Sequence, residues 1–202
     1  MNKSIKDYKA IILDMDGTMY FQFPLRVCMA CSLLVYYTIH FWRIKELFLI
    51  KQFRGLREKG LLKKSENFVD EETKKIIDFW IYEYPLRFIR MFRDKKLIEM
   101  VNKLKLRGTM IIVYSDYYVY DKVKTIDVNI DYCFYSGDKI VNCLKPNSSG
   151  LRNILKEIEV ESCDCLFIGD RYEKDGVCAK TVGMDFIILG KNPLSRISFY
   201  NS

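Results

Sequence analysis

Residues 8–18 read Tyr-Lys-Ala-Ile-Ile-Leu-Asp-Met-Asp-Gly-Thr. The run from Ala10 to Leu13 is short, apolar and partly β-branched, which favours a buried β-strand over a helix. Gly17 marks a tight exit from that strand. Two carboxylates, Asp14 and Asp16, therefore stand where the predicted first strand ends.

Similar apolar runs follow along the chain and predict further strands, at 109–114, 163–168 and 186–189 and more weakly at 132–135. Helical spacing of apolar residues appears between them, over 95–106 and 151–158. Strands that alternate with helices predict a parallel sheet with right-handed crossovers. The expected fold class is α/β, with a Rossmann-like parallel-sheet core.

The stretch from Phe21 to Arg93 interrupts this alternation, because helical patterns follow one another there without a convincing strand. One of these helices is expected to start at Asp70 and run to about Tyr82, where Pro85 follows. We therefore expect a core formed by residues 1–20 and 94–202, and a helical cap inserted at 21–93. The total of 202 residues is enough for one such core with a modest insertion.

The charge of the chain is basic, with 33 Lys and Arg against 26 Asp and Glu. Residues 43–64 alone hold eight basic and two acidic side chains, a net charge of +6. Such a run is most often a solvated helix face. The alternative is that the cap presents cations to a phosphorylated substrate or to nucleic acid. A single histidine, His40, argues against a site built from several histidines.

The seven cysteines form neither a zinc-ribbon pattern nor an even set. The first residues lack the apolar stretch of a secretory signal, so reduced thiols and a cytoplasmic location are expected. Residues 27–42 are almost uncharged but shorter than the roughly 20 residues of a membrane span. A buried or half-buried helix is therefore expected there, and no transmembrane segment. The flanking Arg26 and Arg43 leave a membrane-surface role as the alternative.

Polar side chains gather at the carboxyl ends of the predicted strands, where parallel α/β sheets bind ligands. They are Asp14, Asp16, Ser115, Asp116, Asp170 and Asp175, with Lys145 just before a helix. Carboxylates crowded in one crevice repel each other unless a cation joins them. Oxygen ligands suit a hard ion, and Mg²⁺ fits best because it also accepts water and phosphate oxygens. A carboxylate is also able to attack phosphorus and form an aspartyl-phosphate.

Four sequence segments resemble, in the same order, the four motifs of the haloacid dehalogenase (HAD) superfamily. They are Asp14-Met15-Asp16-Gly17-Thr18, Ser115, Lys145 and residues 169–175 (Gly-Asp-Arg-Tyr-Glu-Lys-Asp). The resemblance covers about two thirds of the chain. Residues 176–184 and an insertion directly after the first motif resemble the phosphoglycolate phosphatase-like branch with its helical cap.

The resemblance implies a role for each matching residue. Asp14 is expected to be the nucleophile and a Mg²⁺ ligand. Asp16 is expected to serve as acid and base and to offer a backbone carbonyl to the metal. Ser115 and Lys145 are expected to hold the phosphoryl group, while Asp170 binds Mg²⁺ and Asp175 supports the metal site. The acid at Asp16 disfavours a true dehalogenase.

The expected function is thus a Mg²⁺-dependent phosphatase acting on a small phosphorylated metabolite. A phosphosugar mutase uses the same motifs and stays open as an alternative. A non-catalytic module whose basic cap binds nucleic acid or a membrane surface is the other alternative, and a nucleic-acid partner is less favoured. The C-terminal residues 192–202 suggest only a surface segment, and the sequence indicates no oligomeric state.

Overall fold

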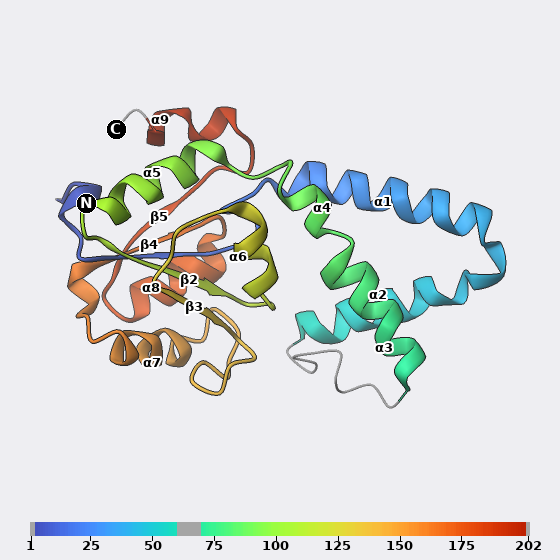
Figure 1. Cartoon of the computed structure of the whole chain (residues 1–202). Helices are drawn as coiled ribbons and strands as arrows, with labels where there is room; N and C mark the ends of the chain where they lie inside the picture. The colour runs from blue at the N-terminus through green and yellow to red at the C-terminus, as the bar shows by residue number, and fades with distance from the viewer. Residues whose placement is uncertain (1–2, 60–69, 201–202) are drawn as a thin grey trace.

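Five parallel strands form the central sheet of the computed structural model, which describes residues 3–59 and 70–200 (Figure 1). The strands stand in the order β3-β2-β1-β4-β5. Their bounds are β1 Ala10–Leu13, β2 Met110–Ser115, β3 Tyr132–Tyr135, β4 Cys165–Gly169 and β5 Asp185–Ile188. The predicted α/β class and parallel sheet are confirmed, with β1 at the centre between β2 and β4.

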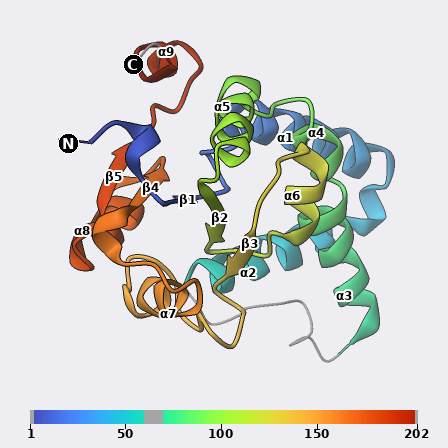
Figure 2. The same cartoon turned by 60° about the vertical axis from the view of Figure 1, so that its left-hand side comes forward.

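Alternate residues of the central strands point to opposite faces of the sheet, and each face has its own apolar cluster. Ile11 and Leu13 belong to the cluster covered by α5 (Lys95–Leu106) and α6 (Tyr120–Ile126). Ala10 and Ile12 belong to the cluster covered by α7 (Ser149–Glu157) and α8 (Val177–Thr181). Figure 2 shows these helix pairs on the two sides of the sheet. A sheet covered on both faces explains why its strands are continuous apolar runs.

The described part of residues 21–93 forms helices and no strand. The helices are α1 Gln22–Ile39, α2 Lys45–Glu58, α3 Glu71–Ile77 and α4 Leu86–Ile89, with a short helical turn at Phe41–Arg43 and a π-helical segment at Asp78–Glu83. They share an apolar cluster that is separate from the two sheet clusters, formed by Tyr37, Ile50, Phe53, Ile77 and Trp80.

The chain leaves and re-enters the sheet region through two segments that lie side by side. The backbone amide of Phe21 donates to the carbonyl of Phe92 at 3.0 Å, and that of Asp94 donates to Met19 at 2.9 Å. Asp94 also caps α5, because its Oδ1 accepts from the Leu97 amide at 3.2 Å. Residues 21–93, which lie between these two segments, are called the cap below.

Two helix predictions are confirmed in extent. The helix expected from Asp70 to about Tyr82 begins as α3 and continues to Glu83, although its last six residues have π-helical hydrogen bonds. The apolar run of residues 27–42 was expected to be buried or half-buried, and it is half-buried: Tyr37 is buried, whereas Leu34 and Ile39 are exposed. Hydrophobicity around the whole helix does not by itself show what covers it.

Candidate active site

Lys145 lies at the centre of the candidate site, buried between two carboxylates. Its Nζ is 2.6 Å from Asp14 Oδ1 and 2.6 Å from Asp175 Oδ1. Asp14 follows β1, Asp175 lies after β4, and Lys145 comes from the loop before α7. The parallel topology therefore brings together at one sheet edge three residues that are up to 161 positions apart in the sequence.

Asp170 completes a cluster of three carboxylates with Asp14 and Asp175, since one oxygen of each lies within 4.8 Å of the others. Two glycines make this approach feasible. A Cβ at Gly17, where φ is +99°, would lie 2.3 Å from Asp170 Oδ2. A Cβ at Gly169 would lie 2.5 Å from the Asp175 side chain. Any other residue at either position would push the carboxylates apart.

The electrostatics of this cluster favour an added cation. Burial raises the pKa of Asp14 well above its usual range, and Asp175, Asp170 and Asp16 raise it further, whereas Lys145 lowers it. Burial and the neighbouring Asp175 raise the pKa of Asp170 to about 6. One lysine does not balance three carboxylates. An all-oxygen donor set with excess negative charge fits a hard divalent cation such as Mg²⁺.

Asp16 lies apart from the carboxylate cluster. Its Oδ1 accepts from Lys122 Nζ at 2.5 Å and from the Tyr20 hydroxyl. Burial raises the pKa of Asp16, but the Lys122 ammonium and the hydrogen bonds from Lys122 and Tyr20 outweigh burial, so the pKa is lowered overall. Asp16 is thus held ionised in this structure, and its expected backbone carbonyl contact to a metal stays a prediction.

Thr18 follows β1 and Ser115 ends β2, at the sheet edge where Asp14 lies. Thr18 Oγ1 donates to Asp14 Oδ2 at 3.2 Å, which fixes the carboxylate that the resemblance marks as nucleophile. Ser115 is fully buried at the end of β2, and its Oγ accepts from the Tyr117 amide at 3.2 Å. Asp116 Oδ1 accepts from the Lys145 amide at 2.8 Å and so positions the lysine backbone.

Three cations near the site were not singled out from the sequence. Lys122 pairs with Asp16, and Lys174 pairs with Asp116 at 2.7 Å. Arg57 reaches over from α2 of the cap, with its guanidinium carbon 3.9 Å from the centre of the Tyr117 ring. The basic run at 43–64 includes Arg57, but no sequence signal separates it from its neighbours, and Lys122 carries no signal at all.

Arg196 ties the C-terminal segment to the loop that holds the first motif. It is fully buried and donates to the carbonyl oxygens of Gly17 at 2.5 Å and Thr18 at 2.6 Å. It also pairs with Asp94 at 2.8 Å. Most of the described C-terminal segment is exposed, as expected, but the burial of Arg196 was not predicted, because a lone arginine in a polar tail carries no sequence sign of burial.

A profile of haloacid dehalogenase-like hydrolases matches residues 8–183. A search of curated proteins finds no match. Among solved structures, a 2-haloacid dehalogenase from Pseudomonas syringae is similar at a TM-score of 0.67 and 15% identity, covering 90% of this chain and 86% of that one. A HAD-superfamily hydrolase from Geobacter sulfurreducens has a TM-score of 0.62 and 16% identity, covering 96% and 91%. A predicted phosphoglycolate phosphatase from Haemophilus somnus has a TM-score of 0.59 and 14% identity, covering 93% and 86%. At these identities the structural likeness shows the fold.

Proposed function

The chain belongs to the haloacid dehalogenase-like hydrolases, and from this membership we propose that it is a Mg²⁺-dependent phosphatase that hydrolyses a small phosphomonoester through an aspartyl-phosphate. The observation that carries the proposal is Lys145 bridging Asp14 and Asp175 beside Asp170. This arrangement supports the proposal, because it brings to one sheet edge a carboxylate proposed as the nucleophile, a cation proposed to bind the phosphoryl group and oxygen atoms proposed as metal ligands.

In the first step an Asp14 oxygen attacks phosphorus, and the bond from phosphorus to the leaving oxygen breaks. Asp16 gives that oxygen a proton. In the second step Asp16 takes a proton from water, the water oxygen bonds to phosphorus, and the bond to Asp14 breaks. Lys145 and Ser115 hold the phosphoryl group throughout, with Lys145 offsetting its charge.

Asp16 needs different protonation states in these two steps. Lys122 keeps its pKa low in this structure, which suits the base that activates water. A bound phosphate competes for Lys122 and adds negative charge nearby, and both effects raise the pKa of Asp16 toward the acid role. Lys122 is therefore proposed to tune the acid–base residue.

Asp14, Asp170 and Asp175 would hold Mg²⁺, with the Asp16 carbonyl as a further ligand. When bound, Mg²⁺ supplies positive charge that stabilises the phosphoryl oxygens as the transfer proceeds. The cap, proposed to span residues 21–93 over a core of 1–20 and 94–202, serves as a lid. The contact between Arg57 of the cap and the Tyr117 ring supports this, because Tyr117 follows Ser115 by only two positions in the sequence.

A reducing, cytoplasmic location is also proposed. All seven cysteines are free thiols in the structure, including the pair Cys28 and Cys31. Burial raises the pKa of Cys165 and of Cys178 to about 12, which keeps both as unreactive thiols.

Phosphate release from a panel of phosphomonoesters tests the proposal. Release should require Mg²⁺, stop with EDTA, and fall at least about a thousandfold in Asp14→Asn, because the amide is no nucleophile. Asp127→Asn is the matched control, since Asp127 is exposed and its left-handed backbone suits asparagine equally well. Halide release from 2-haloacids without phosphate release would instead make the chain a dehalogenase.

A further inference from the structure

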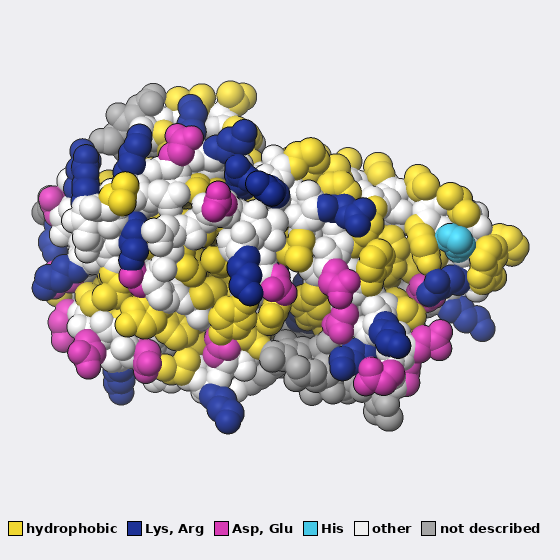
Figure 3. Space-filling model, viewed as in Figure 1, with side chains coloured by type: hydrophobic (Ala, Val, Ile, Leu, Met, Phe, Trp, Pro, Cys, Tyr) yellow, Lys and Arg dark blue, Asp and Glu magenta, His cyan; other side chains and the backbone are white. Residues whose placement is uncertain are grey.

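The outer face of the cap carries an apolar surface that nothing in the described structure covers. Along α1 it consists of Phe23, Val27, Leu34, Val35 and Ile39, and beyond the helix it continues through Phe41, Trp42, Ile44 and Phe48. We call these nine residues the outer apolar face. Leu34 is 67% exposed, Phe41 70%, Trp42 64% and Phe48 71%. Figure 3 shows hydrophobic side chains gathered over α1 and the turn that leads into α2.

The inner side of α1 is anchored to the cap. Met29, Leu33 and Tyr36 pack against the cluster around Trp80, and the centres of the Tyr36 and Trp80 rings are 5.2 Å apart. The Tyr37 hydroxyl donates to Glu46 Oε2 at 3.0 Å. The helix is thus apolar on both sides, but only the inner side has partners among the described residues. Exposed apolar patches of this kind mark interaction sites.

α1 has the length and composition of a membrane-crossing helix, with a mean hydropathy of 1.2 over 18 residues, of which 11% are buried. Crossing a bilayer would pull its inner side away from Trp80 and Glu46. Lying flat in the interface keeps those contacts and covers the outer apolar face. The fold therefore favours a helix that lies on a membrane over one that spans it.

The charge around the outer apolar face selects an anionic surface. Residues 22–51, which contain the outer apolar face, hold four basic side chains and one acidic side chain, Glu46. Glu46 is buried and already paired with Arg43, so it presents no negative charge to a partner. Lys45 and Lys51 on α2 are exposed, and Lys45 lies three residues after Trp42. Trp and Phe beside lysine are typical of segments that sit among lipid headgroups.

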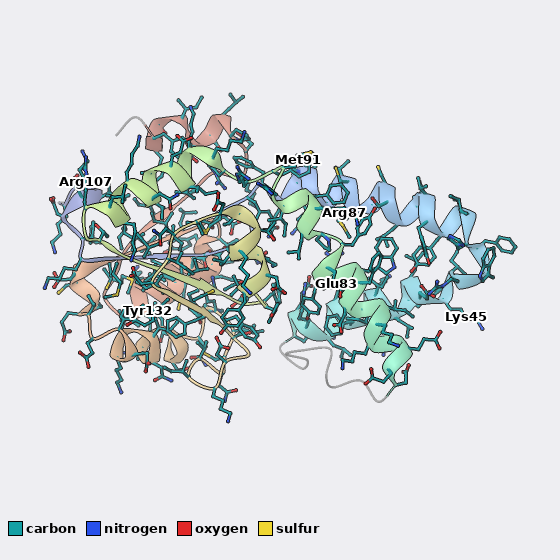
Figure 4. The ribbon with its side chains drawn as sticks, viewed as in Figure 1. Lys45, Glu83, Arg87, Met91, Arg107 and Tyr132 are labelled. Carbon is teal, nitrogen blue, oxygen red and sulfur yellow. The ribbon has the colours of Figure 1, made fainter. Side chains whose placement is uncertain are left out.

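We infer that the cap docks on an anionic lipid bilayer through the outer apolar face, with Phe41 and Trp42 inserted among the headgroups and Lys45 and Lys51 against lipid phosphates. Figure 4 shows Lys45 at the far end of the cap from the sheet, so these lysines and aromatic rings lie on the part of the cap that extends away from the core. The inference does not depend on the proposed phosphatase activity.

Co-sedimentation with vesicles tests the inference, using pure phosphatidylcholine and a mixture with about one third phosphatidylglycerol. The full-length protein should bind the anionic vesicles more strongly. Phe41→Ser/Trp42→Ser should weaken the partition at least about tenfold on anionic vesicles, because two large apolar side chains no longer insert. Lys45→Gln/Lys51→Gln should weaken it about tenfold on anionic vesicles, with little change on phosphatidylcholine.

Leu106→Ser is the matched control, because Leu106 is 86% exposed but lies at the core end of the molecule, beside Arg107. Its partition should equal that of the wild type. Fluorescence gives a second readout, since Trp42 is exposed and the other tryptophan, Trp80, is buried. Anionic vesicles should shift the emission to the blue in the wild type and leave Phe41→Ser/Trp42→Ser unchanged.

Absence of binding to either vesicle by the wild type would overturn the inference. So would equal weakening by Leu106→Ser, because binding would then not involve the outer apolar face. Sedimentation equilibrium without lipid tests whether a second copy of the chain, and not a membrane, covers the outer apolar face. A wild-type dimer that becomes a monomer in Phe41→Ser/Trp42→Ser would show that a second copy of the chain covers this face. All variants are at exposed positions, and circular dichroism checks that they fold.

Discussion

The sheet edge and the outer apolar face place different kinds of side chain in surroundings that are unfavourable for them. At the sheet edge, charges are buried and depend on each other, as Lys145 does on Asp14 and Asp175. On the cap, large apolar groups such as Phe41 and Phe48 are in water. Both arrangements cost free energy in the isolated chain. The difference teaches that each region is built for a partner, a cation and phosphate in one case and an apolar surface in the other.

Removing the central cation should break the sheet edge most severely. Lys145→Met leaves three crowded carboxylates without a counter-charge, and breaking a buried ion pair costs about 3–5 kcal/mol. Phosphatase activity should fall at least about a hundredfold, because the phosphoryl group loses its cation. Urea unfolding and phosphate release measure the two effects. Lys156→Met, at an exposed position on α7, should change neither. Unchanged stability of Lys145→Met would show that the pairs with Asp14 and Asp175 contribute nothing to the fold.

Arg196 offers a test at the back of the same site. Arg196→Met should lower the free energy of unfolding by about 3 kcal/mol, because Asp94 and two carbonyl oxygens of the first-motif loop lose a buried donor. Arg196→Lys should recover only part of this loss, since an ammonium does not reproduce the planar fork of donors. Arg107→Met, on the exposed surface, is the control for urea unfolding. Equal unfolding curves for Arg196→Met and Arg107→Met would mean that the hydrogen bonds of Arg196 to the first-motif loop and to Asp94 do not stabilise the fold.

The pH dependence of stability should report on the crowded carboxylates at the sheet edge. Burial and Asp175 raise the pKa of Asp170 to about 6. The folded state therefore holds this proton more tightly than the unfolded state, so the stability that protonated Asp170 contributes without metal should be lost as the pH rises from about 4 to about 6. The raised pKa of Asp170 corresponds to a loss of about 2 kcal/mol, once the effect is reduced for the partial exposure of this side chain to water. Urea unfolding in EDTA measures it.

Saturating Mg²⁺ should remove that loss, because a bound cation stabilises the ionised carboxylates. Over the same pH range in EDTA, the stability of Asp170→Asn should fall less, or rise more, than that of the wild type. An equal pH dependence in the two proteins would mean that the pKa of Asp170 is not raised in the folded state.

The sequence predicts the α/β core best, because the alternation of strands and helices along the chain determines the parallel sheet and its edge. Helix 95–106 and strand 132–135 are observed at those bounds. Asp14 and Lys145 were expected at one sheet edge because parallel strands end together, and they are in contact. Lys122 and Arg57 escaped prediction because each depends on the direction in which a helix turns its side chain, which packing decides.

The cap shows the limit of hydrophobic patterning. An apolar run predicts that a surface will be covered, and residues 27–42 were accordingly expected to be buried or half-buried. Periodicity does not tell a protein partner from a lipid partner, because both reward the same side chains. The structure adds which side of the helix is covered within the chain, since Tyr37 is buried while Leu34 and Ile39 are exposed.

Two phenylalanines on α2 give the smallest expected effect and the sharpest contrast. Phe48 is 71% exposed and Phe53 is fully buried in the cap cluster. Phe48→Ala should change the free energy of unfolding by less than about 0.5 kcal/mol, as exposed positions do. Phe53→Ala should cost about 3–5 kcal/mol through the cavity it leaves. Thermal unfolding without lipid measures both. A large loss of stability in Phe48→Ala would mean that this ring stabilises the fold of the cap. Its exposure would then not indicate that the outer apolar face binds a partner.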